Sequence, residues 1–408
     1  MKINRKGEKV SNEVNAGEAS QVQVQGQERY VLQAKYISNF RCNADVCLES
    51  CCTKYSTVRV DIGTYNLFSR SAPELLKNIG DSEEGFRVVL PYDNVCPFLE
   101  NNRCTIQNKY GESYLPEICC FYPRIFRRLN DLILVSSALP CSEMVKNILF
   151  GSEAFEWVEA AYPRVQDNIA NFLPEEIESD YVYSLLQMHD DVVNLVDKPL
   201  VSNELILVEL LMLSQILDST RKYDWGRSKD FILKRHAKYS VAETYNKYKK
   251  YDSLMIDDYV FSILSMSKMF RPPSFNATIY EVIDFLNKGG LERFEGIVAK
   301  YMAIGKLDLL LKRYLKAKLF EMVFPVCNWG ECCDDTLLII INYVGIRLCL
   351  AAYIDLHGEI PSDDTIVRII TDFESGFYGQ RQMVYENFKD LGWTNFDKTM
   401  ALLLCWYK

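Results

Sequence analysis

The chain has 408 residues, 49% of them hydrophobic and 25% charged, which is ordinary for a soluble globular protein of two or three domains. Its formal net charge of -9 excludes a general nucleic-acid binder with a basic surface. The unusual feature is 14 cysteines against 3 histidines, with nine of the cysteines between Cys42 and Cys141. Cysteines scattered through a core do not cluster in this way, so we expect a special role for that part of the chain.

The first 28 residues combine Lys, Glu, Asn, Gln and Ser without any apolar period. Such a segment buries too little apolar surface to offset the entropy of ordering it, so we expect a flexible tail over residues 1–28. The tail also lacks the apolar run of a signal peptide, which favours a cytoplasmic protein. In a reducing compartment, dense cysteine indicates metal binding or catalysis rather than disulfides.

Residues 29–150 are expected to form an α+β cysteine-rich domain. Short runs of alternating β-branched and polar residues predict strands at three places, Thr57–Ile62, Phe86–Leu90 and Leu129–Ser137. Ser71 and Glu74 have the spacing of a capping box, which predicts a short helix that continues through Leu75 and Leu76.

Residues 151–408 are expected to form a mostly α-helical domain, because apolar residues there recur at helical spacing. The clearest repeats are Leu205, Val208, Met212, Ile216, and then Leu307, Leu311, Leu315, Leu319 and Met322. Thr336–Ile354 is apolar enough for a membrane span, but it contains Asn342 and Arg347. A central arginine costs about 2.5–3.5 kcal/mol in a bilayer, so we expect a buried core helix and no membrane span.

The cysteines of the first domain have short spacings, beginning with a C-x4-C-x3-C-C array. Their positions are Cys42, Cys47, Cys51, Cys52, Cys96, Cys104, Cys119, Cys120 and Cys141. Short spacings let one loop supply two sulfur ligands while distant loops supply the others. No histidine lies between residues 29 and 150, which favours an iron–sulfur cluster or a four-cysteine zinc site. Zinc sites of this kind usually have paired C-x2-C motifs, which are absent here, so zinc is less favoured than an iron–sulfur cluster. A domain that binds no metal is the third alternative.

Six motif pieces then occur in one order along the chain. The cysteine array is followed by D-I-G-T-Y from Asp61, C-P-F-L from Cys96, C-T-I from Cys104, C-x-x-Y-P-R from Cys119 and P-C-S-E around Cys141. This order resembles the flagellin lysine-N-methylase family, which belongs to a wider set of cysteine-rich zinc- or iron-chelating proteins. In the second half, Leu311–Pro325 is similar to a tyrosine-containing helix of that family.

The resemblance implies an enzyme, a protein-lysine N-methyltransferase. It would transfer methyl groups from S-adenosylmethionine to lysine side chains of flagellin and hold an iron–sulfur cluster, 4Fe-4S in type. The ligand positions that the resemblance implies are Cys42, Cys47, Cys51, Cys52, Cys96, Cys104, Cys119 and Cys141. Cys120 stands where the motif has a basic or polar residue, so it is not assigned. Eight exceeds the four ligands of one cluster, which means either two centres or some cysteines that only pack nearby.

The remaining cysteines and the histidines have plainer interpretations. Cys327, Cys332 and Cys333 form a C-x4-C-C loop, which either completes a site between the domains or, as we favour, carries free cysteines. Apolar helical surroundings place Cys349 and Cys405 in the core. The three histidines, at positions 189, 236 and 357, are far apart in the sequence and are expected to be solvated or packing residues.

Lysine methylation needs a neutral amine, and only roughly one lysine in two or three thousand is neutral at pH 7. Candidate bases are Asp61, Tyr65 and Tyr122, although Asp61 and Tyr65 equally suit the cap of a turn. Three arginines, Arg124, Arg127 and Arg128, either bind the donor carboxylate, neutralise the thiolates or are solvated, and we favour the last two.

No G-x-G turn is present in the sequence, so no donor pocket or catalytic residue is assigned. A non-catalytic zinc- or iron-chelating adaptor protein is the alternative function.

Overall fold

The structure is a computed structural model of the chain. It describes residues 29–42, 47, 51–54, 58–83, 85–92, 95–101, 103–162, 165, 169, 179–197, 202–221, 259, 262, 280–282, 284, 288, 304–326, 331–377 and 381–404. The tail predicted over residues 1–28 lies outside the described residues, as do Cys327, Cys405 and His236.

Four strands form the larger sheet, in the order β7-β8-β1-β9. Their bounds are β1 (Arg29–Ala34), β7 (Arg124–Leu129), β8 (Leu132–Ser137) and β9 (Trp157–Tyr162). β1 runs parallel to β8, with Leu32 opposite Leu134, and antiparallel to β9. β7 and β8 form an antiparallel hairpin with Asn130 in its turn at φ 54°. Asparagine tolerates this left-handed conformation better than most residues, which is why the chain reverses there.

The cysteine-rich segment forms a group of short elements around a small core. Its strands are β2 (Val58–Arg59), β3 (Ile79–Asp81) and β4 (Arg87–Val89) in the order β2-β4-β3, and the hairpin of β5 (Leu99–Glu100) and β6 (Arg103–Cys104). Its helices are α1 (Cys51–Lys54), α2 (Ile62–Ser71), η2 (Pro73–Asn78), α3 (Thr105–Tyr110), η3 (Glu112–Tyr114) and α4 (Glu117–Phe121). The core includes Phe68, Phe98 and Ile106. A core of this size gains much from an additional cross-link.

The predicted strands are present with different bounds. β2 is shorter than predicted because Asp61 caps a helix that begins at Ile62. β4 lies within the predicted strand Phe86–Leu90. The predicted strand Leu129–Ser137 combines the end of β7, the turn at Asn130 and all of β8. Alternation identified these segments as extended, but it did not locate the turn.

The predicted capping box is wrong. Ser71 is the last residue of α2, and the next helix is the 3-10 helix η2, which Pro73 opens without any side-chain cap. Proline suits the first position of a helix because its fixed φ is helical and its missing N–H needs no partner there. Leu75 is buried in the small core, as the predicted helix required.

The second half of the chain is helical where the structure describes it. Its helices are α6 (Ser179–Val196), α7 (Asn203–Arg221), α13 (Gly305–Met322), α14 (Cys332–His357), α15 (Asp363–Phe377), α16 (Arg381–Asp390) and α17 (Phe396–Leu404). The predicted apolar repeats lie in α7 and α13, and all five predicted positions of α13 are buried. These findings confirm small sheets in the first half and a mostly helical chain.

α14 is the centre of the helical core. It packs against α7, α15, α13, α16 and α17, and nearly all of its residues are buried. The helix is long and apolar enough to cross a membrane, but 94% of its most apolar window is buried inside the structure. The prediction of a buried core helix over Thr336–Ile354 is therefore confirmed.

The two polar residues that argued against a membrane span have partners inside the core. Arg347 is fully buried and forms an ion pair with Glu204 of α7, whose carboxylate also accepts a hydrogen bond from Tyr343 at 3.0 Å. Asn342 donates to Glu374 of α15 at 3.3 Å. Buried charges persist in proteins only when they are paired, so these contacts explain why α14 carries them.

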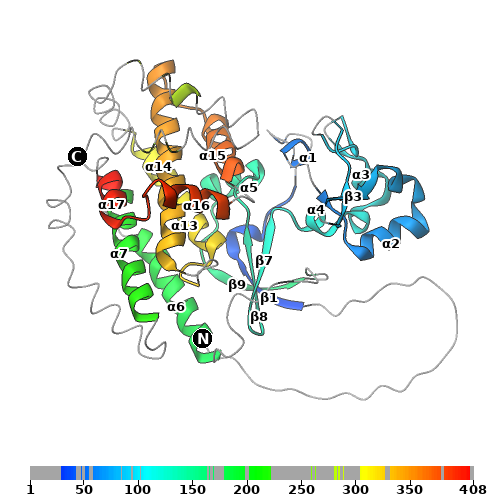
Figure 1. The fold of residues 1–408 in the computed structure, drawn as a ribbon, viewed down its shortest axis with the longest axis horizontal. Coiled ribbons are helices and arrows are strands. Elements are labelled where there is room, and N and C mark those ends of the chain that lie inside the picture. The colour runs from blue at the N-terminus through cyan, green and yellow to red at the C-terminus, as the bar shows by residue number, and fades with distance from the viewer. Residues whose placement is uncertain are drawn as a thin grey trace.

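The helix α5 (Ser142–Phe150) connects the two halves, since it packs against α13 and α15. Figure 1 shows α2, α3 and α4 at one end, the helices α7, α14 and α17 at the other, and the long strands between them. β9 follows residue 150 and pairs with β1, so the sheet uses chain from both sides of the predicted boundary. The division at residue 150 stays a prediction.

Candidate metal centre

The eight cysteines implied as ligands lie in or beside short elements. Cys51 and Cys52 open α1, Cys104 ends β6 and precedes α3, and Cys119 lies in α4. Cys96 lies between an isolated bridge and β5, and its backbone N–H donates to the carbonyl of Cys52 at 3.1 Å. Element ends leave backbone groups and side chains free to point toward a common centre, so they are typical positions for ligands.

Four of these thiols form a group that we call the first thiol group: Cys52, Cys96, Cys104 and Cys119. The thiols of Cys52 and Cys96 are hydrogen-bonded to each other. Cys104 interacts electrostatically with Cys96, and Cys119 interacts with the other three. The group draws on α1, on both sides of the β5–β6 hairpin and on α4, and this convergence of separate elements is what a thiolate centre requires.

Three further cysteines lie together elsewhere, and we call them the second thiol group: Cys42, Cys47 and Cys141. Cys141 is the N-cap residue of α5 and interacts electrostatically with Cys47 and Cys42. The Cys47 sulfur lies 3.2 Å from the hydroxyl of Ser142, which is buried. The eight cysteines are thus sorted into two places, with Cys51 beside Cys52 at the edge of the first group.

The pKa values of these thiols are raised. The hydrogen bond with Cys51, followed by burial, raises the pKa of Cys52 to about 12. Burial, followed by the charge of neighbouring thiols, raises the pKa of Cys119 and that of Cys141, the latter to about 12. Crowded thiols resist ionisation because thiolates repel each other. A cation reverses this preference, since it stabilises the thiolate form.

Among the described residues, which include all eight cysteines, no group of three or more His, Cys, Asp or Glu side chains stands in a metal-binding arrangement. The chemistry of the first thiol group nevertheless fits a thiophilic centre, because all of its donors are sulfur and its members interact with one another. A metal bound there would have to draw the sulfurs closer than they stand in this structure.

Asp61 of the D-I-G-T-Y motif is a helix cap. Its Oδ1 accepts the backbone N–H of Thr64 at 2.8 Å, and its Oδ2 accepts the Thr64 hydroxyl at 2.7 Å. Oδ2 also accepts the backbone N–H of Glu117 at 2.9 Å. Tyr65 packs under the guanidinium of Arg87, 3.8 Å from the ring centre. Both carboxylate oxygens are occupied, which favours the capping interpretation of Asp61 over that of a base.

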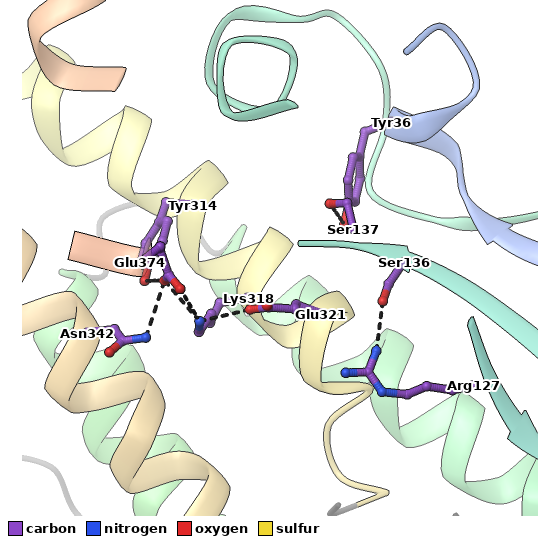
Figure 2. A network of polar contacts seen from close by, with 9 residues as sticks. All are labelled: Tyr36, Arg127, Ser136, Ser137, Tyr314, Lys318, Glu321, Asn342 and Glu374. Atoms are coloured by element: carbon purple, nitrogen blue, oxygen red, sulfur yellow. Dashed lines mark hydrogen bonds and ion pairs between the residues drawn. The ribbon is translucent and has the colours of Figure 1, made fainter. Parts of the chain in front are cut away.

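The three arginines after the C-x-x-Y-P-R motif do not form one basic group. They lie on β7, where successive side chains point to opposite faces, so Arg127 faces away from Arg124 and Arg128. Arg127 is buried and donates to the Ser136 hydroxyl at 2.9 Å (Figure 2). The expectation that Arg127 is solvated is therefore wrong. Arg124 is half-buried, 5.6 Å from the ring centre of Phe40.

Several described cysteines and histidines outside the two thiol groups have packing or hydrogen-bonding contacts. Cys349 is buried in α14, as predicted, and Cys332 is buried with its sulfur 3.5 Å from the carbonyl of Pro325. Cys120 lies 3.9 Å from a carboxylate oxygen of Glu112. His189 is fully buried, so its interpretation as a packing residue is confirmed. Cys327 lies outside the described residues. Cys332 and Cys333 are the first two residues of α14, so the prediction that they lie in a loop is wrong.

Two sets of contacts could not be predicted from the sequence. The link from Asp61 to Glu117 spans 56 positions, and only the fold brings these residues together. In the helical half, the charged residues Lys318, Glu321 and Glu374 are all buried at one place (Figure 2). The helical pattern of α13 places Lys318 beside apolar residues, but a single charged residue there does not identify its partners.

Comparison of the chain with protein-family models, with curated proteins and with solved structures finds no match. The functional interpretation therefore depends on the residues and their arrangement.

Proposed function

We propose that this chain is a thiolate-ligated metalloprotein whose first thiol group holds an iron–sulfur cluster, with zinc as the alternative metal. The observation that carries this proposal is the gathering of four sulfur donors around the small core. The Cys96 backbone N–H donates to the carbonyl of Cys52 at 3.1 Å, Cys96 and Cys104 both pack against that core, and Cys119 lies close enough to interact electrostatically with the other three. Four cysteines and no histidine match the coordination of a single cluster. The second thiol group contains three cysteines, so it would need another donor to complete a centre of its own.

We further propose that the metalloprotein is a cytoplasmic protein-lysine N-methyltransferase that acts on flagellin with S-adenosylmethionine as the donor. This step is supported by the resemblance of the ordered cysteine motifs, D-I-G-T-Y and C-x-x-Y-P-R to the flagellin lysine-N-methylases. S-Adenosylmethionine supplies the methyl group when bound. The protein must supply a site that keeps the lysine amine neutral, by desolvation or through a base.

The competing proposal is a non-catalytic zinc- or iron-chelating adaptor. It is favoured by the role of Asp61, whose oxygens are both occupied, because this removes one of the candidate bases. In an adaptor the metal would cross-link the small core around Phe68 and Phe98, and the helical half would bind a partner.

The first experiment concerns the metal. The protein is purified without oxygen, its iron, sulfide and zinc are measured per chain, and its visible spectrum is recorded. A cluster gives a brown protein that absorbs at about 400 nm with iron and sulfide in equal amounts. A colourless protein that contains zinc would replace the iron–sulfur proposal by the zinc alternative.

The second experiment concerns activity. The purified protein is incubated with flagellin and S-adenosylmethionine, and the intact mass of flagellin is measured. Methylation raises this mass in steps of about 14 Da that disappear without the donor. A protein that retains its metal but leaves the flagellin mass unchanged would exclude the enzyme proposal and favour the adaptor.

A further inference from the structure

The N-terminus of α4, the helix that carries Cys119, is tied to the N-terminus of α2 by a single carboxylate. Asp61 Oδ1 accepts the backbone N–H of Thr64, within its own helix α2. Asp61 Oδ2 accepts both the Thr64 hydroxyl and, from α4, the backbone N–H of Glu117 at 2.9 Å. One side chain thus accepts N–H groups at the starts of two helices, where the helical hydrogen-bond pattern supplies no acceptor.

The position of Cys119 depends on this start of α4. The helix has only five residues, Glu117–Phe121, and its first turn is closed by the Cys119 N–H donating to the carbonyl of Pro116 at 2.8 Å. Cys119 lies two residues after Glu117, so a shift of the Glu117 backbone shifts the Cys119 sulfur with it. A helix this short has little cohesion of its own and takes its position from the contacts at its ends.

We propose that Asp61 is the positioning residue that holds Cys119 toward the other sulfurs of the first thiol group. This inference rests on the proposed metal centre and assigns a role to the D-I-G-T-Y motif within it. In this role Asp61 acts through the Glu117 backbone, whose N–H its Oδ2 accepts at 2.9 Å. Residues that orient ligands in this way change metal affinity by about 10–100-fold when they are replaced.

The test uses two substitutions of Asp61 in the full chain. Asp61→Asn keeps an oxygen to accept the Thr64 backbone N–H but places an amide NH2 at the position of Oδ2. The Thr64 hydroxyl can rotate to accept from this group, whereas the Glu117 N–H cannot, so the link to α4 is the contact that is lost. Asp61→Ala removes the cap and the link together. Ser82→Ala is the matched control, because the Ser82 hydroxyl accepts the backbone N–H of Phe86 at 3.1 Å without touching a cysteine-bearing element.

Two readouts are measured for each variant. The first is the rate at which a chelator removes the metal, followed through metal content and the visible spectrum. The second is the rate of alkylation of Cys119 relative to Cys104 in the metal-free protein, resolved by peptide mass spectrometry. Asp61→Asn is expected to lose metal about 10–100-fold faster than the unmodified protein and to alkylate faster at Cys119, with Ser82→Ala unchanged in both.

The outcomes separate the inference from the proposal on which it rests. An unmodified protein that binds neither iron nor zinc overturns the metal centre and with it the role of Asp61. An unmodified protein that binds metal, with an Asp61→Asn variant equal to it in chelation and in Cys119 alkylation, overturns the role of Asp61 alone. Circular dichroism identifies a variant that fails to fold, and Asp61→Asn, which retains the α2 cap, then gives the deciding comparison.

Discussion

Lys318 of α13 lies 2.7 Å from a carboxylate oxygen of Glu374 on α15, and both side chains are almost fully buried. Glu321, one turn further along α13, lies 2.8 Å from the same ammonium. Tyr314 and Asn342 donate to the Glu374 carboxylate, so the network joins α13, α14 and α15 (Figure 2). Two carboxylates around one ammonium are tolerable in a core only while every member keeps its partner.

We therefore predict that Lys318→Met destabilises the protein by about 3–5 kcal/mol, although methionine is apolar and of similar length. The substitution leaves the carboxylates of Glu321 and Glu374 buried without the ammonium that compensates them. Equilibrium unfolding in urea at pH 7 measures the change in the free energy of unfolding.

The control for this prediction joins the same two helices at the surface. Lys306 of α13 lies 2.7 Å from Asp363 of α15, with both side chains more than half exposed. Exposed ion pairs contribute less than about 1 kcal/mol, so Lys306→Met is expected to cost little. If Lys318→Met and Lys306→Met lowered the free energy of unfolding equally, burial of the Lys318 network would not increase its contribution to stability.

A second prediction concerns the buried histidine of α6. His189 is fully buried, its Nδ1 lies 2.7 Å from the carbonyl of Phe324, and burial lowers its pKa from 6.5 to about 4. The unfolded chain therefore binds a proton between pH 6.5 and 4 that the folded protein does not bind. Stability from this source is complete above pH 6.5 and decreases as the pH falls toward 4, by about 3 kcal/mol in total.

His189→Gln should flatten the dependence of unfolding free energy on pH between 6.5 and 4, because glutamine does not titrate. His357→Gln, which removes an exposed histidine at the end of α14, is the matched control. Urea titrations at half-unit steps of pH give the slope for each protein. A slope in His189→Gln as steep as in the unmodified protein would assign the acid sensitivity to other groups.

These contacts also show what the sequence can predict. Apolar repeats at helical spacing located α7 and α13, because each repeat marks a buried face that belongs to one helix. Arg347 and Asn342 identified α14 as a core helix, since a bilayer would leave them without partners. Patterns of this kind depend on residues within a single helix, so the sequence alone predicts these helices correctly.

The contacts that shape the candidate site are not local. The cysteine spacings indicated a centre, but they could not sort the eight cysteines, because Cys119 joins Cys52 whereas Cys141 joins Cys47. The fold determines that division. A short-range pattern can also mislead. The residues from Ser71 to Glu74 match a capping box, but Ser71 is the last residue of α2, and the next helix begins at Pro73.

A third prediction concerns the N-terminus of α14. The carboxylate of Asp218, near the end of α7, accepts the backbone N–H groups of Cys332 and Cys333 at 2.7 and 2.9 Å. Asp218→Ala leaves both donors without this cap and removes a negative charge from the positive end of the helix dipole. The expected loss is about 1–2 kcal/mol of unfolding free energy, measured by urea denaturation.

The partner variant for this cap is Glu331→Gln. Glu331 lies immediately before α14 and is exposed, so its charge is near the same helix end. Its side chain does not cap the helix, and a loss below about 0.5 kcal/mol is expected. If Glu331→Gln cost as much as Asp218→Ala, general charge at the helix end would explain the effect, and the two hydrogen bonds would not.

The last prediction separates the two thiol groups. Cys104→Ser removes a sulfur from the first group, and Cys141→Ser removes one from the second. If the first group alone holds the metal, Cys104→Ser loses it and Cys141→Ser retains it at the level of the unmodified protein. Cys120→Ser is the matched control, because Cys120 is adjacent to Cys119 but directs its thiol to Glu112. Iron, sulfide and zinc per chain are measured after anaerobic purification.

The pattern across the three variants determines the number of centres. If Cys141→Ser and Cys104→Ser each lost about half of the metal, the second group would hold a metal of its own, with a fourth donor. Complete loss in both variants would mean that binding draws the two groups into one centre, since a site that must converge on its metal forms only with all of its ligands. Loss in Cys120→Ser would contradict the ligand set, because serine cannot replace a thiolate ligand and Cys120 is not assigned as one.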